Sequence, residues 1–258
     1  MRSPLCIKFH LPCPQRLKTL SFIQSFFNSS ICNSMNATTT SLNVEQARFN
    51  MIEQQIRPWD VLDFRVLDVL RSVRRECFVP NEYRLQAFSD VMLPLAHGQC
   101  MMSPIVEGRV LQALNVQEGE RVLELGTGSG FLAACLSQMG GHVTSVEIFD
   151  TLSERARCVL NEQGYSAVSL ETGDASQGWN DHHVYDVIAI TGALPTIPEV
   201  YKHKLSVGGR LFAVVGHEPV MQAVLVTRDA ENEWRLDSLF ETSLPYFVNA
   251  VPAAKFSF

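Results

Sequence analysis

The stretch that decides the fold is Glu124-Leu125-Gly126-Thr127-Gly128-Ser129-Gly130. It overlaps the end of a short apolar segment, Arg121–Leu125, that is typical of a buried strand, and precedes an apolar segment, Phe131–Met139, that is typical of a helix. Glycines at such a turn permit a tight bend and let backbone N–H groups approach a ligand closely. The stretch therefore predicts a ligand-binding loop between a strand and a helix.

Two acids further along the chain extend this loop into a predicted binding site. Glu147 ends the next predicted strand, about 20 residues after Gly126, where a carboxylate can accept hydrogen bonds from ribose hydroxyls. After the third predicted strand comes Gly173-Asp174-Ala175, where the acid can accept from an adenine amino group. A glycine-rich turn with a surface glutamate is the simpler alternative, but the loop, the helix and the acid at this distance together argue against it.

Two ligands fit such a site, a nicotinamide dinucleotide and S-adenosylmethionine. The dinucleotide fingerprint is G-x-G-x-x-G, whereas this loop has the spacing G-x-G-x-G, followed by Phe131. Glu124 precedes the loop and can meet the ammonium group at the amino-acid end of S-adenosylmethionine, so the sequence favours the methyl donor. The predicted cofactor-binding residues are Glu124, Gly126, Thr127, Gly128, Gly130, Glu147, Asp174 and Ala175.

Strands and helices alternate along the second half of the chain. This alternation predicts an α/β, Rossmann-like fold with a parallel sheet and helices on both faces. The predicted strands are residues 121–125, 142–148, 167–170, 184–190, 210–215, 221–228 and 233–241.

Helical patterns precede this core. One helix is expected from residue 43 to Arg57, and a second has an apolar stripe from Leu62 to Val73. Ser103-Pro104 is typical of an N-cap followed by a first-turn proline, and Glu107 adds an acid that the helix dipole favours. We predict a helical cap with a substrate loop over residues 43–104 and a core over 105–258; the alternative is that these helices form the outer layer of one domain.

Residues 1–42 differ in composition from the rest. They contain four basic residues and no acid, since the first acid is Glu45, and they are rich in Ser, Asn and Thr. Such a leader is transit-peptide-like, but a true start at Met35 is the simpler interpretation. We therefore expect residues 1–42 to lie outside the fold.

We predict that a chain beginning at Met35 folds and binds S-adenosylmethionine as well as the full chain does, because nothing before Asn43 has a strong core-forming period. Thermal unfolding and binding calorimetry on the two chains check this. A clear loss of melting temperature or affinity in the shorter chain would show that the leader belongs to the fold.

Composition excludes several classes of protein. The net charge of −6 and the absence of a large Lys/Arg cluster give no sign of nucleic-acid binding. The seven cysteines are odd in number and contain no C-x-x-C pair, which argues against a disulfide framework or zinc site and favours reduced thiols in the cytoplasm. His182-His183 is typical of a solvated turn, so no metal is expected, and no apolar run is long enough to cross a membrane.

A succession of short motifs resembles the protein-L-isoaspartate O-methyltransferase family in kind and in order, over roughly residues 43–227. The resemblance implies a seven-stranded methyltransferase sheet, S-adenosylmethionine as cofactor, and methyl esterification of isoaspartyl carboxylates in peptides or proteins as a repair reaction. The matching segments are Leu95-Ala96-His97-Gly98-Gln99, Val122–Gly130, Gly173-Asp174, Gly178-Trp179, Tyr185-Asp186, Val207–Leu211 and Val214–Gly216.

The resemblance breaks at the substrate loop. Family members typically read Thr-Ile-Ser-x-Pro, with the serine helping to hold the substrate carboxylate, whereas this chain reads Cys100-Met101-Met102-Ser103-Pro104. Met102 occupies the serine position, so we expect weak or absent isoaspartyl methylation. Ser103 and His97 are the candidate catalytic residues, although an N-cap role for Ser103 and a structural hydrogen bond for His97 are the simpler alternatives.

The sequence is also compatible with three other functions. They are a methyltransferase of the same family with a different peptide or small-molecule acceptor, a non-catalytic module that binds S-adenosylmethionine, and a nicotinamide-dependent oxidoreductase. Turnover of the methyl donor separates the module from the enzymes, and a cofactor titration separates the oxidoreductase. The sequence leaves the acceptor and the oligomeric state open.

Overall fold

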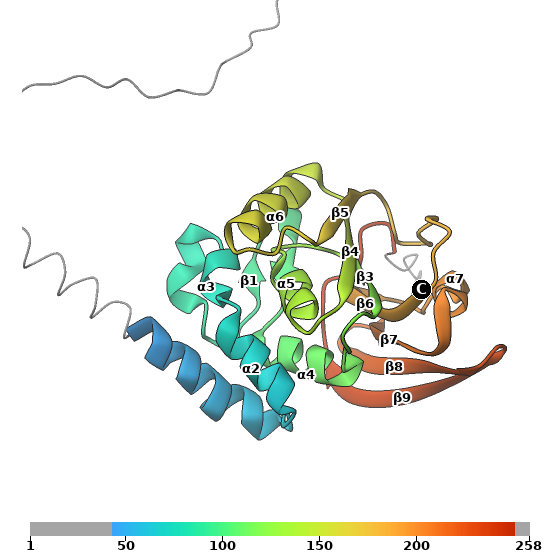
Figure 1. The fold of residues 1–258 in the computed structure, drawn as a ribbon, viewed down its shortest axis with the longest axis horizontal. Helices are drawn as coiled ribbons and strands as arrows, with labels where there is room; N and C mark the ends of the chain where they lie inside the picture. The colour runs from blue at the N-terminus through green and yellow to red at the C-terminus, as the bar shows by residue number, and fades with distance from the viewer. Residues whose placement is uncertain (1–42, 251–258) are drawn as a thin grey trace, which may run out of the picture. The chain divides into compact units, whose positions relative to one another are not determined.

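The structure, a computed structural model, describes residues 43–250, and its centre is a sheet of seven strands. In chain order these are β3 Arg121–Leu125, β4 His142–Glu147, β5 Ser169–Thr172, β6 Tyr185–Leu194, β7 Leu205–His217, β8 Val220–Ala230 and β9 Glu233–Thr242. Across the sheet they lie in the order β5-β4-β3-β6-β7-β8-β9 (Figure 1). The predicted α/β, Rossmann-like fold is confirmed.

The direction of the strands differs in part from the prediction. The first five strands run parallel. The predicted parallel arrangement does not extend to β8 and β9, because β8 pairs antiparallel with β7 and β9 pairs antiparallel with β8. Only residues 218–219 and 231–232 separate these strands, and a parallel neighbour needs a crossover of roughly a dozen residues or more.

Both faces of the sheet are covered. The helices that flank it are α4 Pro104–Leu114, α5 Phe131–Gln138, α6 Asp150–Glu162 and α7 Glu199–His203. Successive strand residues point to opposite faces, so Val122 packs in the apolar cluster shared with α4, α5 and α6, and Leu123 packs in the cluster that contains Tyr201 of α7. Helices on both faces are thus confirmed, although the second face carries only the short α7 and loops.

The predicted N-terminal helices are present and pack on α4. Residues 43–50 are helical and continue into η1 Met51–Ile56 and η2 Arg57–Trp59, followed by α2 Phe64–Ser72, α3 Arg75–Phe78 and η3 Asn81–Gln86. Ile56 and Leu70 reach Gly108 of α4, where an added β-carbon would lie 2.9 Å from Ile56 Cγ2 and 3.6 Å from Leu70 Cδ1. The cap and the core therefore share one apolar cluster, and the boundary at residue 104 stays a prediction. The leader lies outside the described residues.

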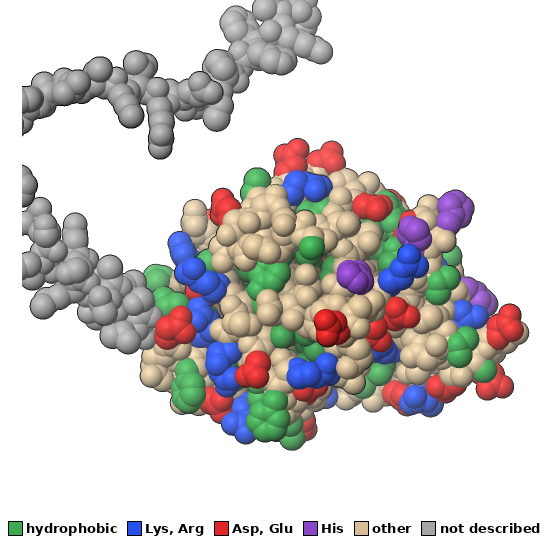
Figure 2. Space-filling model, in the orientation of Figure 1, with side chains coloured by type: hydrophobic (Ala, Val, Ile, Leu, Met, Phe, Trp, Pro, Cys, Tyr) green, Lys and Arg blue, Asp and Glu red, His purple; other side chains and the backbone are tan. Residues whose placement is uncertain are grey.

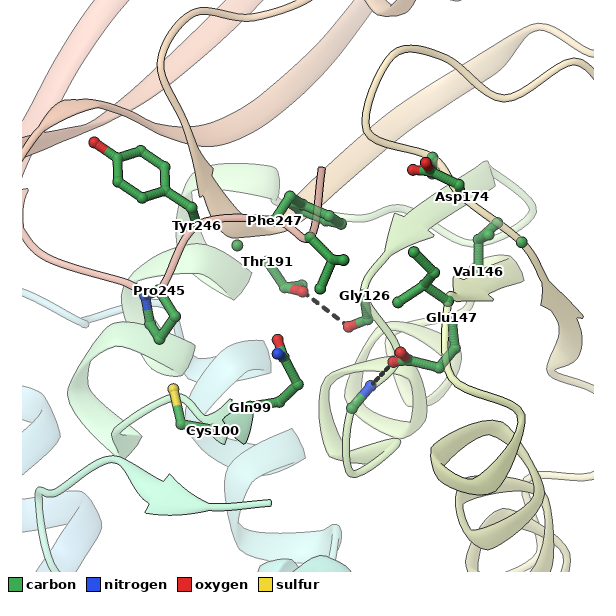
Figure 3. A pocket seen from close by; sticks show the side chains of 16 residues that line it. Gln99, Cys100, Gly126, Val146, Glu147, Asp174, Thr191, Pro245, Tyr246 and Phe247 are labelled. Atoms are coloured by element: carbon green, nitrogen blue, oxygen red, sulfur yellow. Dashed lines mark hydrogen bonds between the residues drawn. The ribbon is translucent and has the colours of Figure 1, made fainter. Parts of the chain in front are cut away.

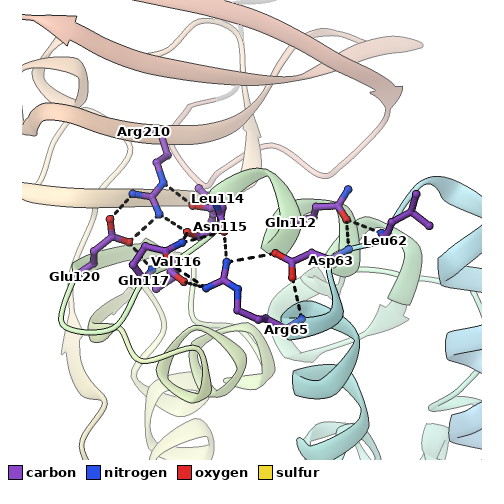
Figure 4. A network of polar contacts seen from close by, with 10 residues as sticks. All are labelled: Leu62, Asp63, Arg65, Gln112, Leu114, Asn115, Val116, Gln117, Glu120 and Arg210. Atoms are coloured by element: carbon purple, nitrogen blue, oxygen red, sulfur yellow. Dashed lines mark hydrogen bonds and ion pairs between the residues drawn. The ribbon is translucent and has the colours of Figure 1, made fainter.

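Leu62 departs from the predicted apolar stripe. It precedes the N-cap Asp63 of α2 and is 59% exposed, whereas Val66 and Leu70 are buried. Its backbone N–H instead donates to Gln112 Oε1 of α4 at 2.7 Å (Figure 4). Leu62 is thus held to α4 by a backbone hydrogen bond, whereas the apolar pattern predicted that its side chain would be packed there.

A second set of polar contacts ties the end of α4 to both the cap and the sheet. Arg65 of α2 donates to the Val116 carbonyl at 3.1 Å and to the Asn115 side chain. Arg210 of β7 forms two bonds to the Glu120 carboxylate, at 2.5 and 2.8 Å, and donates to the Asn115 carbonyl at 2.7 Å (Figure 4). The loop after α4 is therefore held from two sides.

A short hairpin lies between the cap and α4. It consists of β1 Leu93–Pro94, the single turn η4 Ala96–Gly98 and β2 Cys100–Met101, with β1 and β2 antiparallel. β2 leads directly into the predicted substrate loop and then into α4.

The surface is mixed in charge on the face that Figure 2 draws. Lys and Arg side chains are interspersed there with Asp and Glu side chains, with no large area of a single sign. Within residues 43–250, no helix combines the length and apolar character that a membrane crossing requires.

Candidate active site

A cavity opens where the parallel strands β3 and β4 end, beside Thr191 and Gly192 of β6 (Figure 3). Ligands of open α/β sheets bind at this edge, outside the carboxyl ends of the strands. We call it the main cavity. Its walls come from the glycine loop, the end of β4, the turn after β5, the middle of β6 and two segments outside these elements. The lining residues are Gln99, Cys100, Gly126, Gly128, Val146–Ile148, Gly173–Ala175, Thr191, Gly192 and Pro245–Val248.

The glycine loop has the backbone that only glycine adopts freely. Gly126 and Gly128 have φ values of 93° and 52°. A β-carbon on Gly126 would lie 2.4 Å from Thr191 Oγ1, which donates to the carbonyls of Leu125 and Gly126. The loop therefore passes close to β6. Gly130 lines neither cavity described here; its position faces Ala156 of α6 instead.

Glu147 organises the loop from the end of β4. Its carboxylate accepts from the backbone N–H of Gly128 at 2.9 Å (Figure 3) and from that of Phe149 at 3.1 Å. The side chain is buried yet lines the main cavity. Each carboxylate oxygen has a second lone pair, so Glu147 can hold the loop and still accept hydrogen bonds from a ligand.

Glu124 lies at a second, smaller cavity beside the glycine loop. We call it the inner cavity; it is lined by residues 100–102, Glu107, Glu124, residues 126–129, Leu132 and Thr191. Glu124 is fully buried, accepts from Ser145 Oγ at 2.5 Å through Oε2, and leaves Oε1 without a partner. Burial raises its pKa to about 8, although the Ser145 hydrogen bond opposes the rise. An orphaned carboxylate oxygen favours a cationic partner here.

Two further predicted cofactor residues, Thr127 and Asp174, line different cavities. Thr127 lines the inner cavity and its hydroxyl meets Ser145 Oγ at 2.6 Å. Asp174 lines the main cavity beside Ala175, and accepts from the Ser176 N–H at 2.8 Å and from Asn249 Nδ2 at 2.9 Å. These bonds lower the pKa of Asp174, so its carboxylate is ionised and fixed in direction.

The segment of residues 244–250 forms a strap across the main cavity that the sequence analysis missed. The Ala193 N–H donates to the Pro245 carbonyl and the Phe247 N–H to the Ala193 carbonyl, both at 2.9 Å. Phe247 reaches the loop, 3.4 Å from a β-carbon added to Gly126. The segment has no glycine loop or acid pattern, so only its adjacent aromatic residues Tyr246 and Phe247 could have drawn attention to it.

The two candidate catalytic residues lie outside the lining of both cavities. His97 stacks on Phe149 with ring centroids 4.2 Å apart, and its Nε2 meets Thr151 Oγ1 at 2.7 Å. This arrangement is that of a structural hydrogen bond. Ser103 is the N-cap of α4, but its side chain makes no capping bond; Asp90 Oδ1 instead accepts from the Ile105 N–H at 3.2 Å.

Met102, by contrast, does line the inner cavity. Next to it lies a buried ion pair between Arg75 and Glu107, which the sequence did not indicate. Arg75 Nη2 donates to the Met102 carbonyl at 2.7 Å, and its Nε lies 3.2 Å from Glu107 Oε2. Both side chains are almost fully buried. Glu107 is therefore an ion-pair partner rather than only the dipole-complementing acid that its place in the first turn of α4 suggested. Burial raises the pKa of Glu107 to about 8, although Arg75 opposes the rise.

In the part of the chain that the structure describes, the other titratable groups do not gather into a metal site. Among residues 43–250 there is no group of three or more His, Cys, Asp or Glu side chains that could hold a metal ion. His183 lies 6.5 Å from Tyr185, ring to ring, before β6. Burial raises the pKa of the Cys100 thiol, which disfavours a thiolate nucleophile at the cavity.

The sheet order, the glycine loop at the end of β3 and the acid at the end of β4 together define the class I methyltransferase fold. The pattern of the family described as Protein-L-isoaspartate(D-aspartate) O-methyltransferase (PCMT) matches residues 46–251. The chain belongs to this family.

Known proteins agree with this assignment. A Rhodopseudomonas palustris protein named Protein-L-isoaspartate O-methyltransferase 1 is 37% identical over 193 residues, which cover 74% of this chain and 79% of that protein. A Gloeobacter violaceus protein named Protein-L-isoaspartate O-methyltransferase is 39% identical over 68% of this chain and 86% of its own length. The fold alone is shared with a crystal structure from Plasmodium falciparum, described as a putative protein-L-isoaspartate O-methyltransferase in complex with S-adenosyl-L-homocysteine. The likeness covers 77% of this chain and 97% of that one, with a TM-score of 0.69 and 16% identity.

Proposed function

We propose that this protein is an S-adenosylmethionine-dependent methyltransferase that esterifies isoaspartyl carboxylates in peptides or proteins. Membership of the family supports the reaction, and the names of its relatives support the substrate class. The observation that carries the proposal is the arrangement in the main cavity, where the glycine loop forms one wall and Glu147 and Asp174 present two carboxylates to one ligand. The free thiols of Cys77, Cys100, Cys135 and Cys158 support a cytoplasmic location.

The residues present fit the cofactor. Glu147 is placed to accept from ribose hydroxyls, Asp174 from the adenine amino group, and the unpartnered Oε1 of Glu124 from the ammonium group. When bound, S-adenosylmethionine supplies a methyl group on a positively charged sulfur. The side chains of the strap cover this site, which excludes water from one side of it.

The acceptor needs positioning rather than activation. A carboxylate with an ordinary pKa near ~4 is already ionised at neutral pH and needs no general base. Holding it in line with the methyl group and sulfur is worth roughly 7–11 kcal/mol at best. The protein's task at the inner cavity is therefore to orient the acceptor, and the Met102 thioether there offers no donor for a carboxylate.

Transfer of a labelled methyl group to an isoaspartyl peptide tests the proposal, with the same peptide containing a normal aspartate as the control. Base-labile label on the isoaspartyl peptide alone is the expected result. Label on neither peptide, although the protein binds the cofactor, would contradict carboxyl methylation. Met102 in the inner cavity is the observation that favours the second candidate, a methyltransferase of this family with a different acceptor, and label on another acceptor would support it.

Cofactor binding is expected to release a proton from Glu124. The pKa of this carboxyl is about 8 because of burial, so at pH 7 it is mostly protonated, and an ammonium partner lowers its pKa and drives the proton off. Affinity should therefore rise with pH up to about 8 and level off above it. Calorimetry at pH 7 in two buffers of different ionisation enthalpy measures the released proton.

The Glu124→Gln variant is the control for this proton, because an amide cannot titrate. Glu107 also has a pKa of about 8, but it keeps Arg75 as its partner before and after binding and should not contribute. Proton release of the same size in Glu124→Gln as in the unchanged protein would exclude Glu124 as the source.

A further inference from the structure

The peptide between Met102 and Ser103 has a fixed direction. Its carbonyl accepts from Arg75 Nη2 at 2.7 Å, and among residues 43–250 the only cis peptide bond is Glu218–Pro219, so this peptide is trans. In a planar trans peptide the carbonyl and the following N–H point in opposite directions. The Ser103 N–H therefore points away from Arg75, and it donates to no group within the described residues.

The group that fixes this direction is itself held firmly. Arg75 lies 3.2 Å from the Glu107 carboxylate and 5.2 Å from the ring centroid of Phe131, which begins α5 directly after the glycine loop. It also contacts Met101 Sδ at 3.4 Å. Because Arg75 has no exposed surface, it cannot reach an acceptor, and its effect passes through the backbone it binds.

Few other donors are available to a carboxylate at this place. Neither cavity is lined by a Lys, Arg or His residue. The Thr191 hydroxyl is already donated to the carbonyls of Leu125 and Gly126, and the Met102 thioether cannot donate. Of the other side-chain donors, Gln99 Nε2 donates to the His97 carbonyl and the Thr127 hydroxyl meets Ser145 Oγ. The Ser129 hydroxyl, which accepts from the Phe131 N–H, and the Ser103 N–H are then the donors with no acceptor of their own, and a charged acceptor strengthens such a bond.

On the basis of the proposed function, we propose that the Ser103 backbone N–H, rather than a side-chain hydroxyl, is the hydrogen-bond donor to the acceptor carboxylate, and that Arg75 is the positioning residue that aims it. The serine hydroxyl of the family loop is thereby replaced in this chain by a main-chain donor one residue further along. Asp90 makes this possible, because it caps α4 in place of Ser103.

A matched pair of variants at one position tests the donor. Ser103 has φ −70° and ψ 154°, which proline adopts without strain, so Ser103→Pro removes the N–H with little change of backbone. Ser103→Ala removes only the hydroxyl. We expect Ser103→Pro to lower kcat/KM for an isoaspartyl peptide roughly tenfold to a hundredfold, the range for one hydrogen bond to a charged group, and Ser103→Ala to leave it unchanged. The Kd of S-adenosylmethionine should stay the same in both.

The possible results separate the donor from the proposed function. Unchanged kinetics in Ser103→Pro would overturn the donor assignment alone. Loss of activity in Ser103→Ala would assign the role to the hydroxyl and also overturn it. Failure of the unchanged protein to methylate any isoaspartyl peptide, with cofactor bound, would overturn the proposed function and the assignment with it.

A second set of variants tests Arg75 and decides the matter if Ser103→Pro no longer binds cofactor. Arg75→Met is combined with Glu107→Gln so that no lone carboxylate stays buried. We expect this double variant to lose acceptor kcat/KM by a similar factor at unchanged cofactor Kd, and Ser103→Pro added to it to cause no further loss, since residues that act through one another are not additive. Unchanged acceptor kinetics in the double variant would show that Arg75 only supports the fold. So would a triple variant whose loss in kcat/KM equals the product of the losses caused by the double variant and by Ser103→Pro.

Discussion

Replacing Glu147 with alanine is expected to weaken S-adenosylmethionine binding by roughly a hundredfold to ten-thousandfold. The loss of two ribose hydrogen bonds to a charged acceptor, at about 1.5–3 kcal/mol each, accounts for this range. The N–H groups of Gly128 and Phe149 also lose their acceptor, so the loop becomes less ordered before the ligand arrives. Calorimetry with S-adenosylmethionine and with its demethylated product measures the change.

Glu171→Ala is the matched control for Glu147→Ala. Glu171 lies on the neighbouring strand β5, is exposed, and does not line either cavity. Its removal changes the same charge and should leave the affinity unchanged. An unchanged affinity in Glu147→Ala would contradict the cofactor site as it is assigned here.

Replacing Met102 with serine is expected to raise isoaspartyl methylation by about tenfold to a hundredfold over a weak starting rate. The added hydroxyl gives the acceptor carboxylate a charge-assisted hydrogen bond of about 1.5–3 kcal/mol at the place where a thioether gives none. It would act beside the Ser103 N–H as a second donor. Steady-state kinetics on an isoaspartyl peptide measure the gain.

Met92→Ser is the control, because Met92 is also a methionine but lines neither cavity. It is half-exposed, and its sulfur lies 3.8 Å from Cys100 Sγ. This variant should leave the rate unchanged. A high rate in the unchanged protein that Ser103→Ala abolishes and Met102→Ser does not raise would mean that the Ser103 hydroxyl has taken over the role of the family serine.

Local patterns predicted most of the sheet. The bounds of β3 agree with the prediction because a run of apolar residues meets a glycine loop that can only be a turn. β5 lies two residues later than predicted, at Ser169–Thr172, because its residues are mostly exposed and give no apolar run. The antiparallel β8 and β9 could have been predicted from the two-residue gaps that separate them, since gaps of that length leave no room for a crossover.

Site residues could be predicted where they lie close together along the chain. The glycine loop and Glu147 belong to consecutive elements, and their spacing along the chain fixes their meeting in space. The strap of residues 244–250 and the Arg75–Glu107 pair could not be predicted in this way. Their partners lie far apart in the sequence, and a buried arginine in a charged segment looks the same as an exposed one until the fold brings Glu107 and Met102 to it.

The two outer strands of the sheet affect how the protein meets its substrates. β5 has only four residues, and β9 carries Glu233, Arg235, Asp237 and Glu241 along its free edge, with Arg235 paired to Asp229 and Asp237. Short or charged edges resist the addition of a foreign strand, which is how many proteins avoid aggregation. A repair enzyme encounters damaged, partly unfolded chains whose backbones are free to pair. With both edges blunted, we expect an unfolded substrate chain to meet the protein at the cavity and not to pair along the sheet.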